Sequence, residues 1–592
     1  MSLIDELKRR NVFKAGAAYL ALGWVVTQVT STVAPLLHMP DWIGPVVVWI
    51  GVIGFPFVIM FSWIYELTPE GLKREREVDR SASITHITSR RLDYIIIGLL
   101  VVAIGLFAFD RFAPRKAEPA VAAREATSAV PNAPPATSGN SIAVLPFVDM
   151  SQTKDQEYFS DGLSEELLNL LAQVPQLRVI ARTSSFAFKG KEVGVAEIAK
   201  TLNVAHVLEG SVRKSGDTLR ITAQLIRAAD SSHLWSETYD RQLTDVFKVQ
   251  DEIAAAVVAQ LKVKLLPAQN VTNPPRTANT EAYNQYLLGN QFFNRGTVEG
   301  YRLAVAAYKK AIELDPAYAA AYAGLSYAEL YAGDYVGTAE ENIAARQRAL
   351  AAADKSIALA PDLADGYSAR GWLRSSVTRD WSGGQADFEK ALALEPGNAL
   401  VQRRYGVLLQ SLGRLPESIA ATRKAIELDP LSSAAWNNLC GVYSSDPGQF
   451  RAAHEAVDRA LAINPESSFA LSCLAALELL EGHAQQALVV SRRAGEVWSQ
   501  VGIAMAEHTL GHARESQQAL DELIAKYAHV SAYQIAEAYA WRGEPDKAFE
   551  WLERAYAQED GGLSLIKTDL LLKSLWTDAR FAAMVKKLGL PA

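Results

Sequence analysis

The chain has 592 residues, of which 49% are apolar, and it carries 59 Lys and Arg against 66 Asp and Glu, for a net charge of −7. A single hydrophobic core stops growing near about 250–300 residues, so this length excludes one globular domain and predicts several. The acidic balance offers nucleic acid no bulk attraction, and no nucleic-acid partner is expected.

Three apolar stretches occupy the first 110 residues, at about 15–37, 43–65 and 93–110. The first two contain no charged residue and are long enough to cross a hydrocarbon core of about 30 Å as helices. The third is shorter, so it needs snorkelling flanks or local thinning of the bilayer, and a buried helix of a soluble fold is its alternative. We predict three transmembrane helices and therefore a lipid bilayer as one partner.

The basic residues predict the orientation of these helices. Residues 1–14 contain four Lys or Arg and residues 66–92 contain six, whereas the turn at 38–42 has none. Positive charge marks the cytoplasmic side, so we expect 1–14 and the loop 66–92 inside and everything after about residue 110 outside. The predicted location is the cell inner membrane with a periplasmic remainder, and neither inside segment is long enough for a catalytic domain.

Residues 111–140 are rich in Ala, Pro, Ser and Thr, which is the composition of a solvated linker. Regular structure is predicted to resume at Ser141 with the strand SIAVLPF, an amphipathic helix over 156–174, a strand over 177–182 and a helix over 195–202. Strands 204–213 and 218–227 form a predicted hairpin that buries one face, and a last helix covers about 243–265. The expected fold is a compact α/β domain over 141–266.

Phrases in this domain resemble a known family. AVLPF, YFSDGLSEELLNLL, LRVIARTSSFAFKG, VLEGSVRKSGDTLRITAQLI and HLWSETYDR occur in order and are similar to the TolB amino-terminal-like (FlgO-like) domain of bacterial envelope and signalling proteins. The resemblance implies a periplasmic binding or assembly module. In related proteins such a module is sometimes joined through membrane helices to a cytoplasmic cyclase, kinase or DNA-binding domain, and that output domain is missing here.

Five phrases that end on proline recur in the last part of the chain. Pro316, Pro361, Pro396, Pro430 and Pro465 follow one another at intervals of 45, 35, 34 and 35 residues. Small residues lie 12 residues before each proline, where two helices must approach closely. The pattern resembles the tetratricopeptide repeat, which implies a solenoid of helix pairs over about 280–592. We expect six to eight pairs, a longer turn at 333–338 and a closing cap helix.

The first helix of each pair is expected to line the concave surface of such a solenoid. Polar side chains about seven residues after each proline are the candidates for binding a protein or peptide, because Arg and Asn can hold carboxylates or peptide backbone. Ordinary solvated helix faces are the alternative for each of them. The candidates are Ser368, Arg403, Arg404, Asn437, Asn438 and Ser472.

No catalytic motif was found. The chain lacks a phosphate-binding G-x-x-x-x-G-K-[ST] loop, G-x-G-x-x-G and G-x-S-x-G. His508 and His512 lack the H-E-x-x-H arrangement, and Glu165 and Glu166 are adjacent on one helix, so both pairs are predicted to be solvent-exposed. A hydrolytic trio of His233, Ser236 and Asp240 has no evident oxyanion device. We predict no enzymatic activity, no cofactor and no metal.

The only two cysteines, Cys440 and Cys473, lie 33 residues apart on the first helices of consecutive pairs. A disulfide is possible, but two buried packing positions are the preferred interpretation.

The favoured hypothesis for function is therefore an inner-membrane adaptor that presents a periplasmic solenoid to a protein or peptide. The alternatives are a sensory subunit that acts on a separate cytoplasmic effector and an enzyme of unfamiliar type. A homo-oligomer is possible.

Overall fold

The computed structural model describes residues 139–591, apart from 153, 155, 175, 216–217, 243–244, 262–276 and 334–338, and it also describes residues 19, 23, 26–27, 54–55, 65–68 and 71–74. The chain divides into two compact units, Met1–Val130 and Pro131–Ala592. The predicted transmembrane segments and the linker lie almost wholly outside the described residues. Within the part that is described, no helix has both the length and the apolar character needed to span a bilayer.

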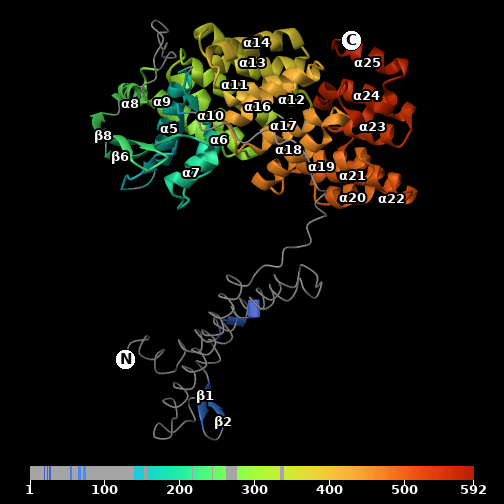
Figure 1. Ribbon diagram of the computed structural model, residues 1–592, viewed down its shortest axis with the longest axis horizontal. Helices are drawn as coiled ribbons and strands as arrows, with labels where there is room; N and C mark the ends of the chain where they lie inside the picture. The colour runs from blue at the N-terminus through green and yellow to red at the C-terminus, as the bar shows by residue number, and fades with distance from the viewer. Residues whose placement is uncertain are drawn as a thin grey trace. The chain divides into compact units, whose positions relative to one another are not determined.

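The first unit contains a short hairpin of β1 (Tyr65–Thr68) and β2 (Gly71–Arg74), which pair antiparallel with Tyr65 opposite Arg74 (Figure 1). Apart from Tyr65, the last residue of the second predicted span, it falls in the predicted loop 66–92, where no strand was expected. The other described residues in the first two apolar stretches are helical, and the ring centroids of Tyr19 and Phe55 lie 6.0 Å apart.

The second unit begins with a sheet in which β4 pairs with β6 beside the strand order β5-β3-β6-β7-β8. β3 pairs parallel with β5 and β6, whereas β6, β7 and β8 form an antiparallel meander. The strands are β3 (Ser141–Val144), β4 (Val148–Asp149), β5 (Arg178–Val179), β6 (His206–Ser215), β7 (Thr218–Arg227) and β8 (His233–Gln242). The helices of this domain are α5 (Glu157–Ala172), α6 (Arg182–Phe186), α7 (Val195–Leu202) and α8 (Val246–Gln260).

Apolar and polar residues alternate along β7, and the apolar side chains face the domain core, as the sequence predicts. Leu219, Ile221, Ala223 and Leu225 are fully buried, and they join α5 and α8 in one cluster. The predicted central α/β domain is thus confirmed, with three additions. The two-residue strand β4, the short helix α6 and the edge strand β8 were not predicted. β8 is mostly polar and buries only Tyr239 among its side chains. A strand with so few inward apolar residues gives little period-2 signal.

Eight helix pairs follow within the described residues, in agreement with the expected six to eight, and the first begins at the predicted Thr280 (Figure 1). The pairs are α9 (Thr280–Phe293) with α10 (Val298–Leu314), α11 (Ala319–Gly333) with α12 (Ala339–Leu359), α13 (Ala364–Leu373) with α14 (Trp381–Leu394), α15 (Ala399–Ser411) with α16 (Leu415–Leu428), α17 (Ser433–Tyr443) with α18 (Phe450–Ile463), α19 (Ser468–Leu480) with α20 (Ala484–Ser491), α21 (Glu496–Thr509) with α22 (Ala513–Tyr527), and α23 (Ala532–Trp541) with α24 (Pro545–Ala557).

Three short elements interrupt or close the array. A π-helical turn, η3 (Arg374–Thr378), extends α13, and a 3-10 turn, η4 (Pro447–Gln449), precedes α18. After α24 come the 3-10 turns η5 (Gly561–Leu565) and η6 (Leu570–Leu575) and the predicted cap helix, α25 (Ala579–Lys587). The expected long turn at 333–338 falls mostly outside the described residues, and α12 is itself 21 residues long, which accounts for part of the longer interval.

Small residues bring the two helices of a pair together, as their spacing predicts. A side chain added at Gly371 on α13 would lie 3.2 Å from the carbonyl oxygen of Gly384 on α14. In the next pair the Ser418 hydroxyl donates to the carbonyl of Gly406 at 2.7 Å. Close backbone approach leaves no room for larger side chains at these positions.

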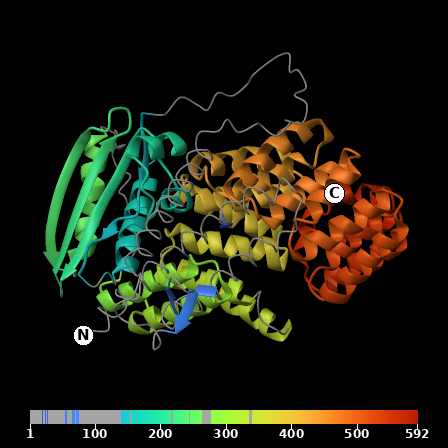
Figure 2. The same ribbon diagram turned by 90° about the horizontal axis from the view of Figure 1, so that it is seen from below.

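The second unit also joins segments that are far apart in sequence. The indole nitrogen of Trp381 donates to the carbonyl of Leu588 at 2.8 Å, and Arg346 pairs with Glu559 at 2.7 Å, so the last repeats contact the second and third pairs. Figure 2 shows the strands at one end of this unit and the C-terminal repeats at the other, with the helix pairs curving between them.

Candidate protein-binding surface

The predicted binding residues lie on consecutive first helices, as their spacing requires. Ser368 lies on α13, Arg403 and Arg404 on α15, Asn437 and Asn438 on α17, and Ser472 on α19. Because the repeat interval is 34 or 35 residues, equivalent positions recur on neighbouring helices. Their environments nevertheless differ from the exposed row that the sequence predicts.

Arg404 is the central side chain of this surface and is 2% exposed. Its Nη2 donates to the Tyr331 hydroxyl at 3.2 Å, and its guanidinium carbon lies 4.5 Å from the ring centroid of Tyr327 and 5.1 Å from that of Trp372. Aromatic faces attract a guanidinium through their quadrupoles. Nε and Nη1 have no hydrogen-bond partner among the described residues, so Arg404 retains two buried donors for a ligand or for water.

A cluster of half-buried aromatic side chains extends this surface toward the first pair. The ring of Tyr331 stacks on Tyr301 at 5.4 Å and meets Phe293 edge-on at 5.7 Å. Tyr, Trp and Arg are the residues most often found at energetically dominant positions of protein interfaces. The sequence prediction missed these aromatics, although Tyr327 and Trp372 each lie 11 residues after a repeat proline and so share one register.

The other predicted residues divide into two kinds. Ser368 is 1% exposed and accepts a hydrogen bond from the Tyr327 hydroxyl at 2.8 Å, and its role in binding stays a prediction. Burial, together with the neighbouring positive charge of Arg404, lowers the pKa of Arg403 to about 10. Asn437 Oδ1 and Asn438 Nδ2 are buried atoms without a hydrogen-bond partner in the described residues. Ser472 is half-buried.

The α/β domain docks on the turns between repeats. Ala181 donates its backbone amide to the Leu428 carbonyl at 2.8 Å, and Ser184 donates its amide and its hydroxyl to the Asp429 carboxylate at 3.1 and 2.5 Å. The Leu431 amide in turn donates to the Ser184 hydroxyl at 2.8 Å. This network holds the α/β domain against the turn that carries Pro430.

Two acidic residues predicted to be exposed also face this contact. Glu165 and Glu166 on α5 are only partly exposed, which corrects the sequence prediction. Arg182 pairs with Glu165 at 3.2 Å, and burial raises the pKa of Glu165. Burial likewise raises the pKa of Asp365 on α13, against the attraction of Arg404. Solvent exposure could not be read from the α5 sequence because it depends on which helices cover it.

The candidate catalytic groups do not assemble. His233, Ser236 and Asp240 are all exposed along β8, and the Asp240 carboxylate is held by Arg220 at 2.7 Å. His508 and His512 are exposed, as predicted.

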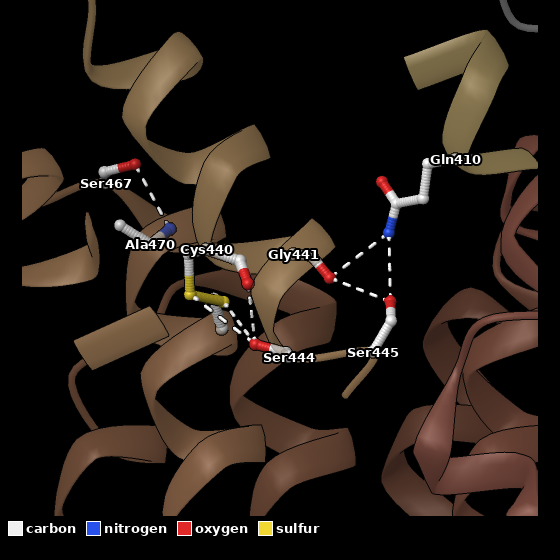
Figure 3. Close-up of a disulfide and its surroundings, with 8 residues drawn as sticks. Gln410, Cys440, Gly441, Ser444, Ser445, Ser467 and Ala470 are labelled. Atoms are coloured by element: carbon white, nitrogen blue, oxygen red, sulfur yellow. Dashed lines mark hydrogen bonds between the residues drawn. A yellow bond between two sulfur atoms is a disulfide. The ribbon is translucent and has the colours of Figure 1, made fainter. Parts of the chain in front are cut away.

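The cysteines form a disulfide, which corrects the preference for two separate packing positions (Figure 3). Cys440 on α17 and Cys473 on α19 have Cα atoms 6.7 Å apart. The Ser444 hydroxyl donates to the Cys440 carbonyl at 2.8 Å and lies 3.6 Å from the Cys473 sulfur. The disulfide links α17 to α19, close in sequence to the predicted binding residues Asn438 on α17 and Ser472 on α19. The 33-residue spacing of the cysteines indicates that α17 and α19 are neighbouring first helices. It does not indicate which faces of these two helices meet.

Three comparisons with known proteins bear on these parts. Residues 138–256 match the family model of the second domain of HilA/YgeH-like transcriptional regulators. A Rhizobium meliloti (strain 1021) protein named "Putative adenylate cyclase 3" is 38% identical over 225 residues, which are 37% of this chain. The chain spans 38% of the length of that relative.

Solved structures similar to the chain include several helical repeat proteins. Pseudomonas aeruginosa PilF is 20% identical, with 36% of this chain and 93% of that chain covered and a TM-score of 0.30. A Thermus thermophilus protein described as a thermophilic TPR protein is 20% identical, with 34% of this chain and 94% of that chain covered and a TM-score of 0.25. The C-terminal region has tetratricopeptide-type repeats, as its own period and helix pairs indicate.

Proposed function

We propose that this chain is a non-enzymatic scaffold that binds a protein or peptide through the first helices of its repeats. The observation that carries the proposal is the Arg404 side chain, buried beside Tyr327 and Trp372 with two donor nitrogens unpaired. Once the covering aromatic side chains shift, a carboxylate or a backbone carbonyl of a partner would satisfy those donors, and the aromatic side chains would supply apolar contact. Asn437 and Asn438 add further unpaired polar atoms on α17, the first helix of the repeat after the one that carries Arg404.

Site-specific crosslinking in intact cells tests this proposal. A photoreactive residue at Asn437 should capture a defined protein, and Arg404→Ala should reduce the yield of that product. Arg451, whose side chain is 82% exposed on α18, is the matched control position for both the crosslinker and an alanine change. Thermal unfolding of each variant establishes that its repeats remain folded. Capture that is equal from positions 437 and 451, or unaffected by Arg404→Ala in a folded chain, would refute the proposal.

The proposed location is the inner membrane, with residues after about 110 in the periplasm. The disulfide supports this proposal, because such bonds form and persist in oxidising compartments. An alkaline phosphatase fusion after Leu261 should be active, and free-thiol labelling of the native chain in cells should leave both cysteines unmodified. An inactive fusion with both thiols labelled would contradict the periplasmic location.

A second candidate function is a sensory subunit that acts on a separate cytoplasmic effector. The match to a protein named as an adenylate cyclase favours it, although that match spans 38% of the relative. The resemblance of 141–266 to the TolB amino-terminal-like family remains a prediction and fits either function. Co-purification of a cyclase, kinase or regulator with residues 1–110 would favour the sensory role, and its absence alongside a periplasmic crosslinked partner would favour the scaffold.

A further inference from the structure

The turn between α19 and α20 brings histidine and glutamate side chains together. Glu478 lies on α19, Glu481 directly follows the last residue of this helix, and His483 precedes α20. Gly482 between them has a φ of +84°, a left-handed conformation that favours glycine and reverses the chain. The His483 amide donates to the Glu478 carbonyl at 2.7 Å, which fixes the turn. The two acidic side chains and the imidazole are thereby held on one side.

Their donor atoms have the separations of ligands around one small cation. His483 Nδ1 lies 3.0 Å from Glu478 Oε2 and 3.9 Å from Glu481 Oε2, and one ligand atom from each of the three residues lies within 4.8 Å of the others. Nitrogen and oxygen ligands bind Zn²⁺ at about 2.0–2.2 Å in tetrahedral geometry, which places them about 3.4 Å from one another. The two distances from His483 differ from this value by about half an ångström, and the two glutamate oxygens would have to approach each other to the same separation.

A second histidine reaches this cluster from a different helix. His454 on α18 places its Nε2 2.8 Å from Glu481 Oε2. A hydrogen bond from a neighbouring group orients a ligating carboxylate and strengthens metal binding. His454 is therefore a positioning residue, and it connects α18 to the turn between α19 and α20.

The charges of the cluster also call for a cation. Among the described residues, neither Glu478 nor Glu481 forms an ion pair with Lys or Arg, and their side chains are only 15% and 29% exposed. Partly buried carboxylates without a cationic partner are costly, and a divalent ion removes that cost.

The next repeat supplies an internal comparison. Its turn has the same Glu, Gly and His spacing, with Gly511 at a φ of +82° and His512 Nδ1 2.7 Å from Glu507 Oε2. There, however, Arg492 lies 3.6 Å from the other Glu507 oxygen and supplies the positive charge. These two turns thus share a His–Glu pair, and the second carboxylate and second imidazole are what distinguish the turn after α19.

We propose that Glu478, Glu481 and His483 bind Zn²⁺, with His454 positioning Glu481. Mixed imidazole and carboxylate ligands suit Zn²⁺, whereas Mg²⁺ and Ca²⁺ prefer six or more oxygen ligands. The His483 side chain is 60% exposed, so the fourth position faces solvent and is open to water or to a side chain of a partner. The bound ion ties α18, α19 and α20 together. This proposal does not depend on the proposed function.

Zinc titration of the purified, untagged full-length chain after chelator treatment tests the site. The wild type and His512→Ala should bind one Zn²⁺ with the same affinity. We expect His483→Ala and Glu478→Gln to weaken binding more than about tenfold and His454→Ala to weaken it about tenfold. Co²⁺ bound to the wild type should give the visible spectrum of tetrahedral coordination, and His483→Ala should lose that spectrum.

Two results would overturn the proposal. The first is a folded wild-type chain that takes up no Zn²⁺ under excess metal, which would leave the cluster as His–Glu ion pairs only. The second is Zn²⁺ binding of equal affinity in the wild type, His483→Ala and Glu478→Gln. Thermal unfolding without metal shows whether each variant is folded, and Glu481→Gln gives a third ligand change if either of the first two is not.

Discussion

Glu395→Gln should stabilise the repeats at alkaline pH and have little effect at acidic pH. Glu395 follows α14 in the turn that carries Pro396, and Asn398 donates to its carboxylate at 3.0 Å. Burial raises the pKa of Glu395 to about 7, and the negative charges of Asp365 and Glu166 contribute to the rise, against the hydrogen bond from Asn398. Glutamine keeps the shape of the protonated side chain and never acquires the charge.

The sign and size of the effect follow from the two pKa values. The folded state binds the proton more tightly than the unfolded chain, whose Glu395 titrates near 4.5, so the free energy of unfolding falls as pH rises from about 4.5 to about 7. A difference of about 2.5 in pKa corresponds to about 3 kcal/mol at most. Because Glu395 is partly exposed, solvent screening reduces this to about 1–2 kcal/mol.

Hydrogen exchange measured by mass spectrometry is the suitable assay, because a chain of several units does not unfold in one step. The opening free energy of α15 should be higher in Glu395→Gln than in the wild type at pH 8, and the two should agree near pH 4.5. Glu466→Gln is the matched control, since Glu466 follows the proline of a later repeat and is exposed. An equal effect of Glu395→Gln at both pH values, or the same pH-dependent gain in the control, would refute the reasoning.

Three further changes test the packing. Replacing Cys440 and Cys473 together by Ser should lower the opening free energy of α17 and α19 by about 3–4 kcal/mol for a 33-residue separation, and reductant should bring the wild type to the same hydrogen-exchange rates. Asp429→Ala should weaken the docking of the α/β domain on the repeats by about 2–3 kcal/mol, because the Ser184 amide and hydroxyl both lose their acceptor. Limited proteolysis should then cleave the α/β domain faster than in the wild type, and Asp429→Asn should have a smaller effect. Gly371→Val should lower the thermal midpoint through about 1–3 kcal/mol of overpacking against α14, and an unchanged midpoint would contradict the close approach.

The sequence by itself determined the local elements of this protein. The interval between Pro396 and Pro430 and the small residues in register with it placed the helix pairs, and alternation along 218–227 placed the buried face of β7. These patterns suffice because a helix or strand that buries one face must repeat apolar or small residues with its own period. The edge strand β8 was not predicted, because it is mostly polar and its apolar residues follow no such period.

Only the tertiary structure decided which distant residues meet. The contact of Ser184 with Asp429 joins positions 245 residues apart, and the disulfide depends on which faces of α17 and α19 oppose each other. Arg404 was found as a candidate by its register, but its burial beneath aromatic side chains follows from the placement of α11 and α13 beside α15. Period along the chain reports which side of an element is buried, and it carries no information about which partner covers that side.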